Sequence, residues 1–485
     1  MKERMRVLLV RPSRGSLQGL EAAALPEPLG LETLAGAVPD CLVVIADLRV
    51  GHRLADYVRA VRPHLCGISC LFTSEARSAL AAARQVKALR PECVVLVGGP
   101  HASLWPVDFA DAAVDAVAIG EGENPLRMTA RALAGDLPLS RVPNLILNTP
   151  DGQVPSAYQQ PQVEDLDLLP MPDRRSLEAH RHRFYLGFDR PSALVETSRG
   201  CPHRCKFCAV WKFHQGKVRT KSVPRVVEEI RQIQAPHVFI TDDNFLHDVN
   251  RVQSLAQALL SAGVAKRYTF QARTDTIARY PEVVKAWSEV GPSSVFLGME
   301  SLSTDTLRAL RKGNTPEQND MALAVLAASG MTYSGNFMVD PRASEADFRA
   351  LRDYVRARGL RNASFSIVTP LPGTDLFAEM QGQLREGNCE LYDLFHVVTE
   401  TALPLEKFYT QYASLWGEVL ALQQQPRPGR ATRLLRGLLS GRVRLSDLRR
   451  GMNVARRLSD AEALLVEHDL HSEPLPPGDR PRFTR

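Results

Sequence analysis

Three closely spaced cysteines, Cys201, Cys205 and Cys208, are the residues of this sequence with the most specific chemistry. They form a CxxxCxxC pattern within residues 196–211. A cubane iron–sulfur cluster needs one ligand for each iron, so three thiolates hold three corners and leave the last iron open to a non-protein ligand. The spacing therefore predicts a [4Fe-4S] cluster that binds a second molecule, with these cysteines as its metal ligands and catalytic centre.

Zinc is the alternative metal for these cysteines, because Cys3His sites are common and His203 and His214 lie nearby. A structural zinc site usually combines two short knuckles, however, and no second CxxC or HxxxH pattern is present. Three cysteines also leave zinc one ligand short unless a histidine folds back. The pattern therefore favours the cluster.

Polar residues that could bind a small ligand follow apolar runs in the second half of the chain. They are Asp243, Arg273, Glu300 and Ser301. Taken singly, each has a structural alternative: Asp243 could begin a helix, and Glu300 could pair with an arginine at the surface. Their repeated position at the ends of apolar runs makes them candidate binding residues, because barrel active sites lie at the carboxyl ends of strands.

Two loops in the first half of the chain also follow apolar runs. Ser69 and Leu71 belong to a Ser-x-Leu turn, and Gly98, Gly99 and His101 belong to a Gly-Gly-Pro-His turn. Paired glycines let the backbone approach a bulky ligand closely. Either loop alone is weak evidence, since glycines after a strand are usually turn residues. The pair resembles the cobalamin-binding fold, in which two such turns hold the nucleotide tail.

The elements that must position these loops form a predicted α/β domain over residues 1–150. Short apolar runs without alternation are typical of strands buried on both faces of a parallel sheet. Helical patterns separate them at 74–87 and 125–133, which predicts a doubly wound, Rossmann-like sheet with ligands beyond its carboxyl ends. The runs are residues 7–10, 42–45, 66–69, 94–97 and 116–119.

A second α/β region is predicted over residues 191–400, after a proline-punctuated linker at 151–190. Six strands alternate with helices there, which is the pattern of a partial (β/α)6 barrel. The predicted strands are residues 193–197, 238–241, 268–273, 294–298, 333–339 and 363–369.

Residues 401–485 are predicted to form a helical, basic C-terminal region with a disordered tail from Ser472. The stretch 427–457 holds ten arginines and one acidic residue. Its leucines and arginines around 433–442 form a basic amphipathic pattern. The default interpretation is a docked helix with a solvated face, and the alternative is peripheral contact with anionic lipid. Nucleic acid is not an expected partner, because aromatics do not interleave with the basic residues.

Composition places the chain among soluble proteins of several domains. The 485 residues exceed one ordinary core, and apolar and charged contents of 44% and 24% are typical of globular proteins. The cysteines outside the cluster are scattered, which fits a reducing cytoplasm better than a disulfide framework. We find no apolar run long enough for a signal peptide or a membrane span, so a cytoplasmic location is expected, with contact at the inner membrane face as the alternative.

The sequence resembles the cobalamin-binding radical S-adenosylmethionine (SAM) family. The resemblance is carried by the cysteine pattern with Phe207 inside it, by the two cobalamin loops, and by Trp211-Lys-Phe213 after the third cysteine. The run 210–217, with Asp242-Asp-Asn-Phe-Leu-His247 downstream, most resembles the hopanoid C-3 methylases. The DxHxxG element of cobalamin-binding domains is missing after the first strand, so no histidine ligand to cobalt is expected from residues 11–19.

The resemblance implies cobalamin, SAM and a [4Fe-4S] cluster as cofactors, and methyl transfer to an unactivated carbon, most simply C-3 of a hopanoid lipid. Arg273 and Ser301 would hold the methionine carboxylate of SAM, and Asp243 and Glu300 its amine and ribose. A small-molecule or lipid substrate and an external electron donor such as flavodoxin or ferredoxin would be the partners. The alternatives are an oxidative cyclase, a methylase of another natural product, and a non-catalytic corrinoid sensor.

Overall fold

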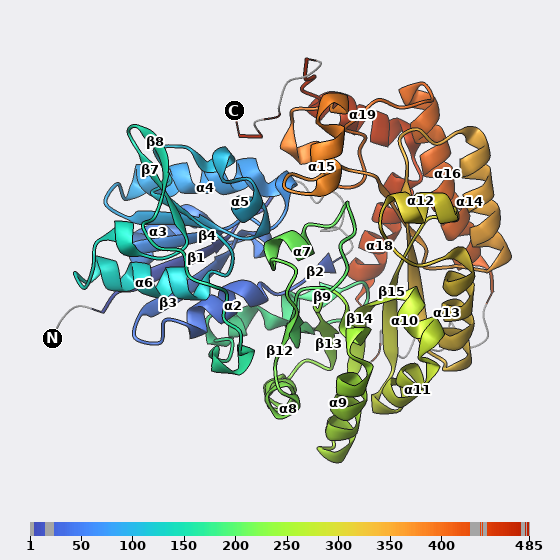
Figure 1. Ribbon diagram of the computed structural model, residues 1–485, viewed down its shortest axis with the longest axis horizontal. Coiled ribbons are helices and arrows are strands. Elements are labelled where there is room, and N and C mark those ends of the chain that lie inside the picture. Colours follow the sequence, from blue (N-terminus) through green and yellow to red (C-terminus); the bar gives the residue numbers. More distant parts are fainter. Residues whose placement is uncertain are drawn as a thin grey trace.

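The computed structural model describes residues 4–14, 24–426, 437, 439, 444–476, 481 and 483–484. An amino-terminal α/β domain lies beside a half-barrel, and carboxyl-terminal helices pack on the half-barrel (Figure 1). The fold class predicted from the sequence is therefore confirmed.

The first sheet has the strand order β3-β1-β4-β5-β6-β7-β8. Its first five strands are parallel, and β7 and β8 extend the edge as an antiparallel hairpin. All five predicted parallel strands are present. The strands are β1 (Arg6–Arg11), β3 (Leu42–Asp47), β4 (Leu65–Ser69), β5 (Val94–Gly98), β6 (Ala116–Ala118), β7 (Leu145–Thr149) and β8 (Gly152–Pro155).

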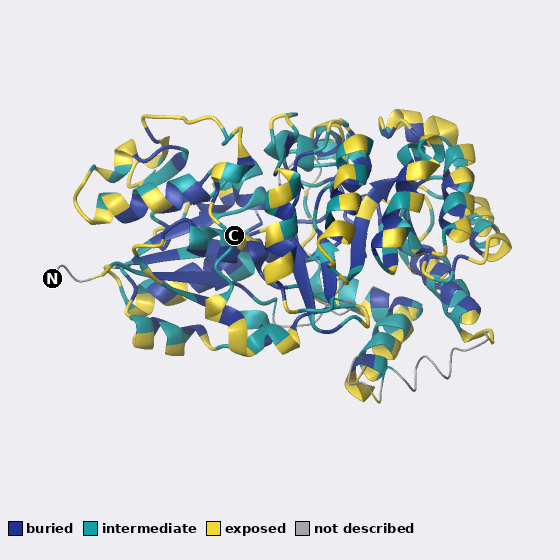
Figure 2. Cartoon of the chain, turned by 90° about the horizontal axis from the view of Figure 1, so that it is seen from below, coloured by how far each residue is buried: buried dark blue, intermediate teal, exposed yellow. Residues whose placement is uncertain are grey.

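Helices cover both faces of this sheet, as its apolar runs require, and the strands between them are buried (Figure 2). In β1, Val7 and Leu9 belong to one buried cluster, whereas Leu8 and Val10 belong to the cluster on the other face. Because side chains alternate along a strand, a strand buried on both faces must be apolar throughout. The covering helices are α2 (Leu29–Gly36) and α6 (Glu123–Leu133) on one face, and α3 (Leu54–Val61) and α4 (Ala76–Leu89) on the other.

The second sheet is a half-barrel of six parallel strands in chain order, as predicted. Its outer face packs against helices in one large core around the fully buried Trp287. The strands are β10 (Ser192–Val195), β13 (His237–Ile240), β14 (Arg267–Arg273), β15 (Ser293–Glu300), β16 (Thr332–Val339) and β17 (Ser364–Ile367). The main covering helices are α8 (Val223–Gln232), α9 (Val249–Ser261), α11 (Pro281–Val290), α13 (Pro316–Ala328) and α14 (Glu345–Ala357).

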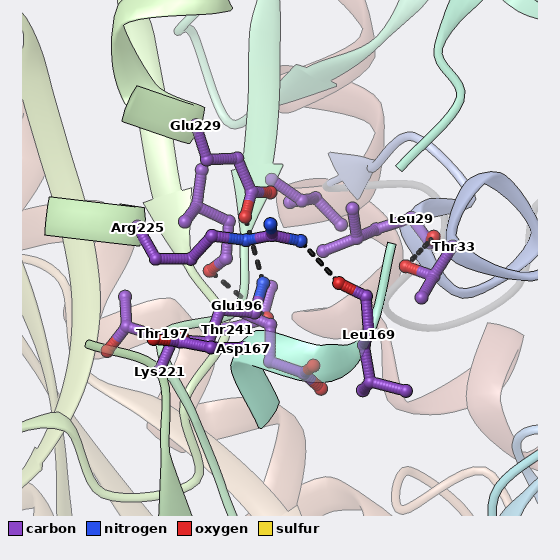
Figure 3. Close-up of polar contacts among 12 residues, drawn as sticks. Leu29, Thr33, Asp167, Leu169, Glu196, Thr197, Lys221, Arg225, Glu229 and Thr241 are labelled. Carbon is purple, nitrogen blue, oxygen red and sulfur yellow. Dashed lines mark hydrogen bonds and ion pairs between the residues drawn. The ribbon is translucent and has the colours of Figure 1, made fainter. Parts of the chain in front are cut away.

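The segment between the two sheets is fastened to both of them. The hairpin β7–β8 carries the first sheet to Pro155, past the predicted boundary at 150. Further on, β9 (Tyr185–Leu186) pairs with β2 (Ala24–Leu25). Leu169 accepts a hydrogen bond from Arg225 Nη2 of α8 (2.5 Å; Figure 3). Arg174 of this segment also forms ion pairs with Glu27 of the first domain and Glu229 of α8, so the segment is part of the domain interface.

The carboxyl-terminal helices are α16 (Leu405–Gln424), α18 (Leu445–Leu458) and α19 (Ala461–His471). Helix α16 buries Phe408 and Tyr412 in the half-barrel core. The predicted amphipathic segment at 433–442 lies almost entirely outside the described residues. None of the helices described here combines the length and the apolar character needed to cross a bilayer.

The described part of the carboxyl-terminal tail, which is predicted from composition to be disordered, contacts the first domain. Phe483 is fully buried, and its ring lies 4.6 Å from that of Tyr392. Its backbone N–H donates to Asp108 Oδ1 (3.1 Å) in the first domain. A polar, proline-rich composition describes the average of a segment, whereas one aromatic side chain can fix its end by filling a hydrophobic site.

Candidate functional site

The three predicted cluster cysteines lie in one loop at the carboxyl end of β10, between β11 (Ser198–Arg199) and α7 (Val210–Phe213). The loop folds back on itself, because Cys208 N–H and Trp211 Nε1 both donate to the carbonyl of Cys205, at 3.2 and 3.0 Å. All three thiols are free. Burial raises their pKa, that of Cys208 to about 12, and a bound metal would reverse this by favouring the thiolates.

The loop gives the zinc alternative no support. Within the described ranges, no three His, Cys, Asp or Glu side chains come close enough together to hold one metal ion. His214 instead has its Nδ1 3.2 Å from Arg219. Cluster thiolates each bind a different iron, so they need not converge on a single point.

Arg273 and Glu300, two of the predicted strand-end residues, are buried together near the thiol of Cys205. Lys312 joins them: its Nζ lies 2.7 Å from Glu300 Oε1, and its carbonyl accepts from Arg273 Nη2 (2.5 Å). Gly298 makes the room, because a Cβ there would lie 2.4 Å from Lys312 Nζ. The partner of Glu300 is thus a buried lysine, which was not predicted, rather than a surface arginine.

Asp243 and Asn244 follow β13, and Asp243 lies beside the cysteine loop. Asp243 accepts a hydrogen bond from the N–H of Gly200, next to Cys201 (3.2 Å), and burial together with Asp242 raises its pKa to about 7. Asn244 is buried, yet neither polar atom of its side chain has a hydrogen-bond partner. Buried amides are normally satisfied, so this one is free for a ligand. Ser301 accepts from Ser303 N–H in a turn (3.1 Å) and contributes no comparable free group.

The two predicted cobalamin loops lie side by side, because Ser69 is paired with Gly98 in the parallel ladder. Gly99 has φ +117°, and a Cβ there would lie 2.5 Å from the carbonyl oxygen of Cys70. Ser69 Oγ is buried without a partner, and Leu71 is 41% exposed. The loops therefore present an unsatisfied hydroxyl, an apolar side chain and a side-chain-free backbone in one place.

His101, which the sequence predicts to contact the ligand, instead makes its hydrogen bonds within the first domain. Its ring is buried, with Nδ1 3.1 Å from Thr73 Oγ1 and Nε2 3.0 Å from Asp108 Oδ2. Both nitrogens are therefore occupied within the domain. We assign this histidine to holding the loop, not to contacting the cofactor.

A buried carboxylate that the sequence analysis missed fixes the Ser-x-Leu turn. Glu75 accepts from the N–H groups of Leu71 (3.0 Å) and Phe72 (3.4 Å), and from Arg11 Nη1 (2.6 Å). Burial would raise the pKa of Glu75, but Arg11 and the N–H groups of Leu71 and Phe72 together keep the pKa below its ordinary value. The turn is thus tied to β1 by an ion pair that sequence spacing does not reveal.

The cobalamin loops and the cysteine loop face each other across the domain interface. Helix α5 (Pro100–Leu104), which follows Gly99, packs on α7, which follows the third cysteine (Figure 1). The rings of Trp105 and Phe377 lie 5.1 Å apart, and a Cβ on Gly373 would lie 2.7 Å from Leu104 Cβ. The segments that follow the Gly-Gly turn and the third cysteine therefore meet at the domain interface.

A buried ionic network holds this interface. Arg199, two residues before the first cysteine, lies 2.9 Å from Glu121 and 2.7 Å from Glu123 of the first domain. Arg219 also lies 2.7 Å from Glu121. Burial would raise the pKa of Glu121, but Arg219 and Arg199 together hold it below its ordinary value. Its contribution to stability is therefore present above about pH 4.5 and lost as pH falls below that.

Removing both acidic partners will loosen the interface. In the double variant Glu121→Gln, Glu123→Gln, the buried Arg219 loses its carboxylate partner and the buried Arg199 keeps only Glu196, which costs about 3 kcal/mol. The midpoint of urea unfolding at neutral pH will fall. When the pH is lowered below about 4.5, the variant will lose less stability than the wild type. Asp136→Asn, which breaks the exposed pair with Arg131, is the matched control and will change stability by less than about 1 kcal/mol. Equal midpoints for all three proteins would contradict a role in domain docking.

Comparison with known proteins decides the family. Residues 16–129 match the model of the B12 binding domain, and residues 195–355 match that of the radical SAM superfamily. Hopanoid C-3 methylase of Methylococcus capsulatus is 30% identical over 87% of this chain and 80% of its own length. The chain belongs to the cobalamin-binding radical SAM family. It is an enzyme, a cobalamin-dependent radical SAM methyltransferase, whose cofactors are cobalamin, SAM and a [4Fe-4S] cluster.

A further relative is a cyclase by name, and two solved structures share the fold. The anaerobic magnesium-protoporphyrin IX monomethyl ester cyclase of Rubrivivax gelatinosus is 26% identical over 80% of this chain and 72% of its own length. Among solved structures, the cobalamin-dependent SAM radical enzyme OxsB has a TM-score of 0.71 at 17% identity, covering 96% of this chain and 75% of its own. The methyltransferase TsrM from Kitasatospora setae has a TM-score of 0.63 at 19% identity, covering 78% of each chain.

The residues of this radical SAM enzyme fit the family's cofactors. The unpartnered hydroxyl of Ser69 and the open backbone at Gly99 suit cobalamin, and the unpartnered amide of Asn244 beside the cysteine loop suits a polar cosubstrate. In the sequence, Asn244 stands out only as part of the run 242–247 that carries the family resemblance, and nothing marks Lys312, which comes close only through chain folding. The predicted absence of a cobalt-binding histidine after β1 concerns a loop whose residues 15–19 lie outside the described ranges.

Proposed function

We propose that this enzyme methylates a hopanoid lipid, at C-3 of its ring system. The observation that carries the proposal is the similarity to hopanoid C-3 methylase along 87% of the chain. That similarity spans both the cobalamin-binding domain and the half-barrel, so it includes the residues that would face the substrate.

The proposed roles of the half-barrel residues follow from their chemistry. When bound, the cluster with SAM supplies hydrogen-atom abstraction, and cobalamin supplies the methyl group. Cys201, Cys205 and Cys208 would hold three irons. Arg273 and Lys312 offer charge-assisted donors for the methionine carboxylate, and Glu300 and Asp243 offer acceptors for its amine and ribose. Trp211 keeps the cysteine loop closed through its hydrogen bond to Cys205.

In the first domain, the proposed role of the two loops is to bind cobalamin. Ser69 would donate to the nucleotide tail of cobalamin, Leu71 would cover it, and Gly98 and Gly99 would let it pass close to the backbone. His101 and Glu75 would position these loops through Asp108 and Arg11. Because α5 packs on α7, the domain interface would exclude water from the space between the cofactors.

Adding a methyl group at Gly298 will test the assignment of the SAM site. In Gly298→Ala, the new Cβ would displace Lys312 Nζ and Glu300 Oε1, which lie 2.4 and 2.6 Å from its position. Both are ends of side chains that can move, so we expect normal folding and normal iron and cobalt contents. The dissociation constant for SAM, measured by equilibrium dialysis, will rise about tenfold through the loss of one charge-assisted contact. An unchanged constant would remove Glu300 and Lys312 from the SAM site.

The electron donor and the membrane contact are further parts of the proposal. The remaining cysteines lack cluster spacing, so the electron would come from an external flavodoxin or ferredoxin.

Helix α18 exposes Leu445 and Met452, at 65% and 52%, on the same stripe as Arg449 and Arg456. Such a stripe suits an anionic lipid surface. We expect sedimentation with phosphatidylglycerol vesicles but not with phosphatidylcholine vesicles, and equal behaviour with both would end this part of the proposal.

Lipid analysis tests the substrate directly. A hopanoid-producing strain that expresses this chain will contain hopanoids with one additional methyl group on the first ring. The Cys205→Ala variant, expressed at the same level, will leave the lipids unchanged. A ring-closed or oxidised product without added methyl would instead favour a cyclase, and unchanged lipids with a competent enzyme would exclude hopanoids as substrate.

A further inference from the structure

The inner face of the half-barrel is open to solvent in the middle of its strands. In β15, Val295 and Leu297 lie in the outer core, so Phe296 between them points inward, and it is 36% exposed. In β14, Phe270 and Ala272 lie in the outer core, and Gln271 between them is exposed. Large apolar side chains at mid-strand positions are normally covered, so this face has room for a ligand.

The face divides into an apolar and a polar wall. The inward-pointing rings of Phe239 on β13 and Phe296 on β15 lie 6.4 Å apart at 65°. The polar wall lies on β16 and β17, where Ser364 Oγ donates to Asn336 Oδ1 (3.1 Å) and Asn336 Nδ2 approaches Ser366 Oγ at 3.5 Å. Since hydroxyls and an amide can both donate and accept, this wall can bind hydroxyl groups.

The same strands lead directly into the cofactor site. Arg273 is the next inward-facing residue after Gln271 on β14, and Glu300 follows Phe296 and Gly298 on β15. A molecule lying on the inner face would therefore end beside the cysteine loop. Among the described strand residues that face inward between the two ends of the half-barrel, none is charged, which suits a neutral molecule.

We infer that the inner face binds the methyl acceptor and selects a neutral amphipathic molecule, with a rigid apolar body against Phe239 and Phe296 and a hydroxyl group against Asn336 and Ser366. The inference rests on the proposed function, because it takes the acceptor to be a polycyclic lipid. It adds the residues that would select the acceptor: the two rings for its hydrocarbon body and, nearer the carboxyl ends of the strands, the polar pair for its hydroxyl group.

Binding of two labelled lipids to the reconstituted holoenzyme tests the inference. The probes are a tritiated pentacyclic hopanoid alcohol and the matching hopanoid hydrocarbon, both in detergent micelles. Phe296→Ala will weaken the binding of both probes about tenfold, since it removes shared apolar contact. Asn336→Leu, nearly equal in volume, will weaken only the alcohol, about tenfold, and Ser366→Ala will do the same to a smaller extent. Met321→Ser, at an exposed apolar position on α13, is the control and will bind as the wild type does.

Iron and cobalt contents, measured for every variant, show that each has folded. Wild-type affinity in both Phe296→Ala and Asn336→Leu would overturn the inference, as would equal weakening of the two probes by Asn336→Leu, or a wild-type enzyme that binds neither probe. Methyl transfer reports separately on the proposed function. A hopanoid that binds with the predicted pattern but receives no methyl group would contradict the proposed function and would not contradict the inferred binding face.

Discussion

Replacement of Cys205 by alanine will remove the cluster and abolish SAM cleavage. Cys205 is the buried centre of the cysteine loop, and its carbonyl also holds Cys208 and Trp211. Mutation of a residue that hydrogen-bonds a metal ligand typically lowers metal affinity 10–100-fold, and loss of the ligand itself lowers it further. Iron per chain, measured after anaerobic reconstitution, will fall from about four to near zero. The release of 5′-deoxyadenosine will fall by at least about a hundredfold.

The control for this variant is Cys41→Ala, because Cys41 is a free thiol of the first domain outside the cysteine loop. It will keep the iron content and the SAM cleavage of the wild type. Cobalamin binding will also survive in Cys205→Ala, since Ser69 and Gly99 belong to the other domain. A Cys205→Ala protein that still binds about four irons and cleaves SAM would refute the assignment of the cluster ligands.

Replacement of Gly99 by alanine will weaken cobalamin binding at least about tenfold. The new Cβ would lie 2.5 Å from the carbonyl oxygen of Cys70, which is backbone and cannot move aside alone. The position also has φ +117° and ψ 175°, a region that essentially only glycine occupies, so about 1–3 kcal/mol of strain is added. We expect the cobalamin dissociation constant, measured by absorbance titration, to rise at least about tenfold, which corresponds to about 1.4 kcal/mol.

Gly135→Ala separates the clash from the backbone effect. Gly135 has φ +94° but no atom within 4 Å of its would-be Cβ. This variant will lose about 1 kcal/mol of stability and keep its affinity for cobalamin. Equal cobalamin binding by Gly99→Ala and the wild type would mean that the cofactor does not pass close to this loop.

The sequence predicted the parts of the fold that depend on local pattern. Uninterrupted apolar runs located the five parallel strands of the first sheet, because strands buried on two faces must be apolar along their whole length. The six strands of the half-barrel followed from their alternation with helices. The cysteine spacing located the cluster loop, since it places three thiols within one turn-rich segment. Strand-end positions such as Arg273 and Glu300 followed from topology, because the carboxyl ends of parallel strands meet at one edge.

Contacts between residues far apart in the chain could not be predicted in this way. Lys312 reaches Glu300 only because the loop after α12 (Thr304–Ala309) turns back over β15, where Gly298 leaves space. Glu75 pairs with Arg11 across two strands, and His101 points toward Asp108 rather than toward a ligand. Phe483 docks on the first domain although its neighbours in sequence are polar.

The most direct test of the account is a single anaerobic reaction that contains the reconstituted enzyme, a reductant, a hopanoid and SAM labelled in its methyl group. We predict that the hopanoid gains one labelled methyl group for each 5′-deoxyadenosine released, and that both products vanish in Cys205→Ala. Release of 5′-deoxyadenosine with a product that carries no label would contradict methyl transfer. Failure to form either product with protein of full iron and cobalt content would contradict the enzymatic role itself.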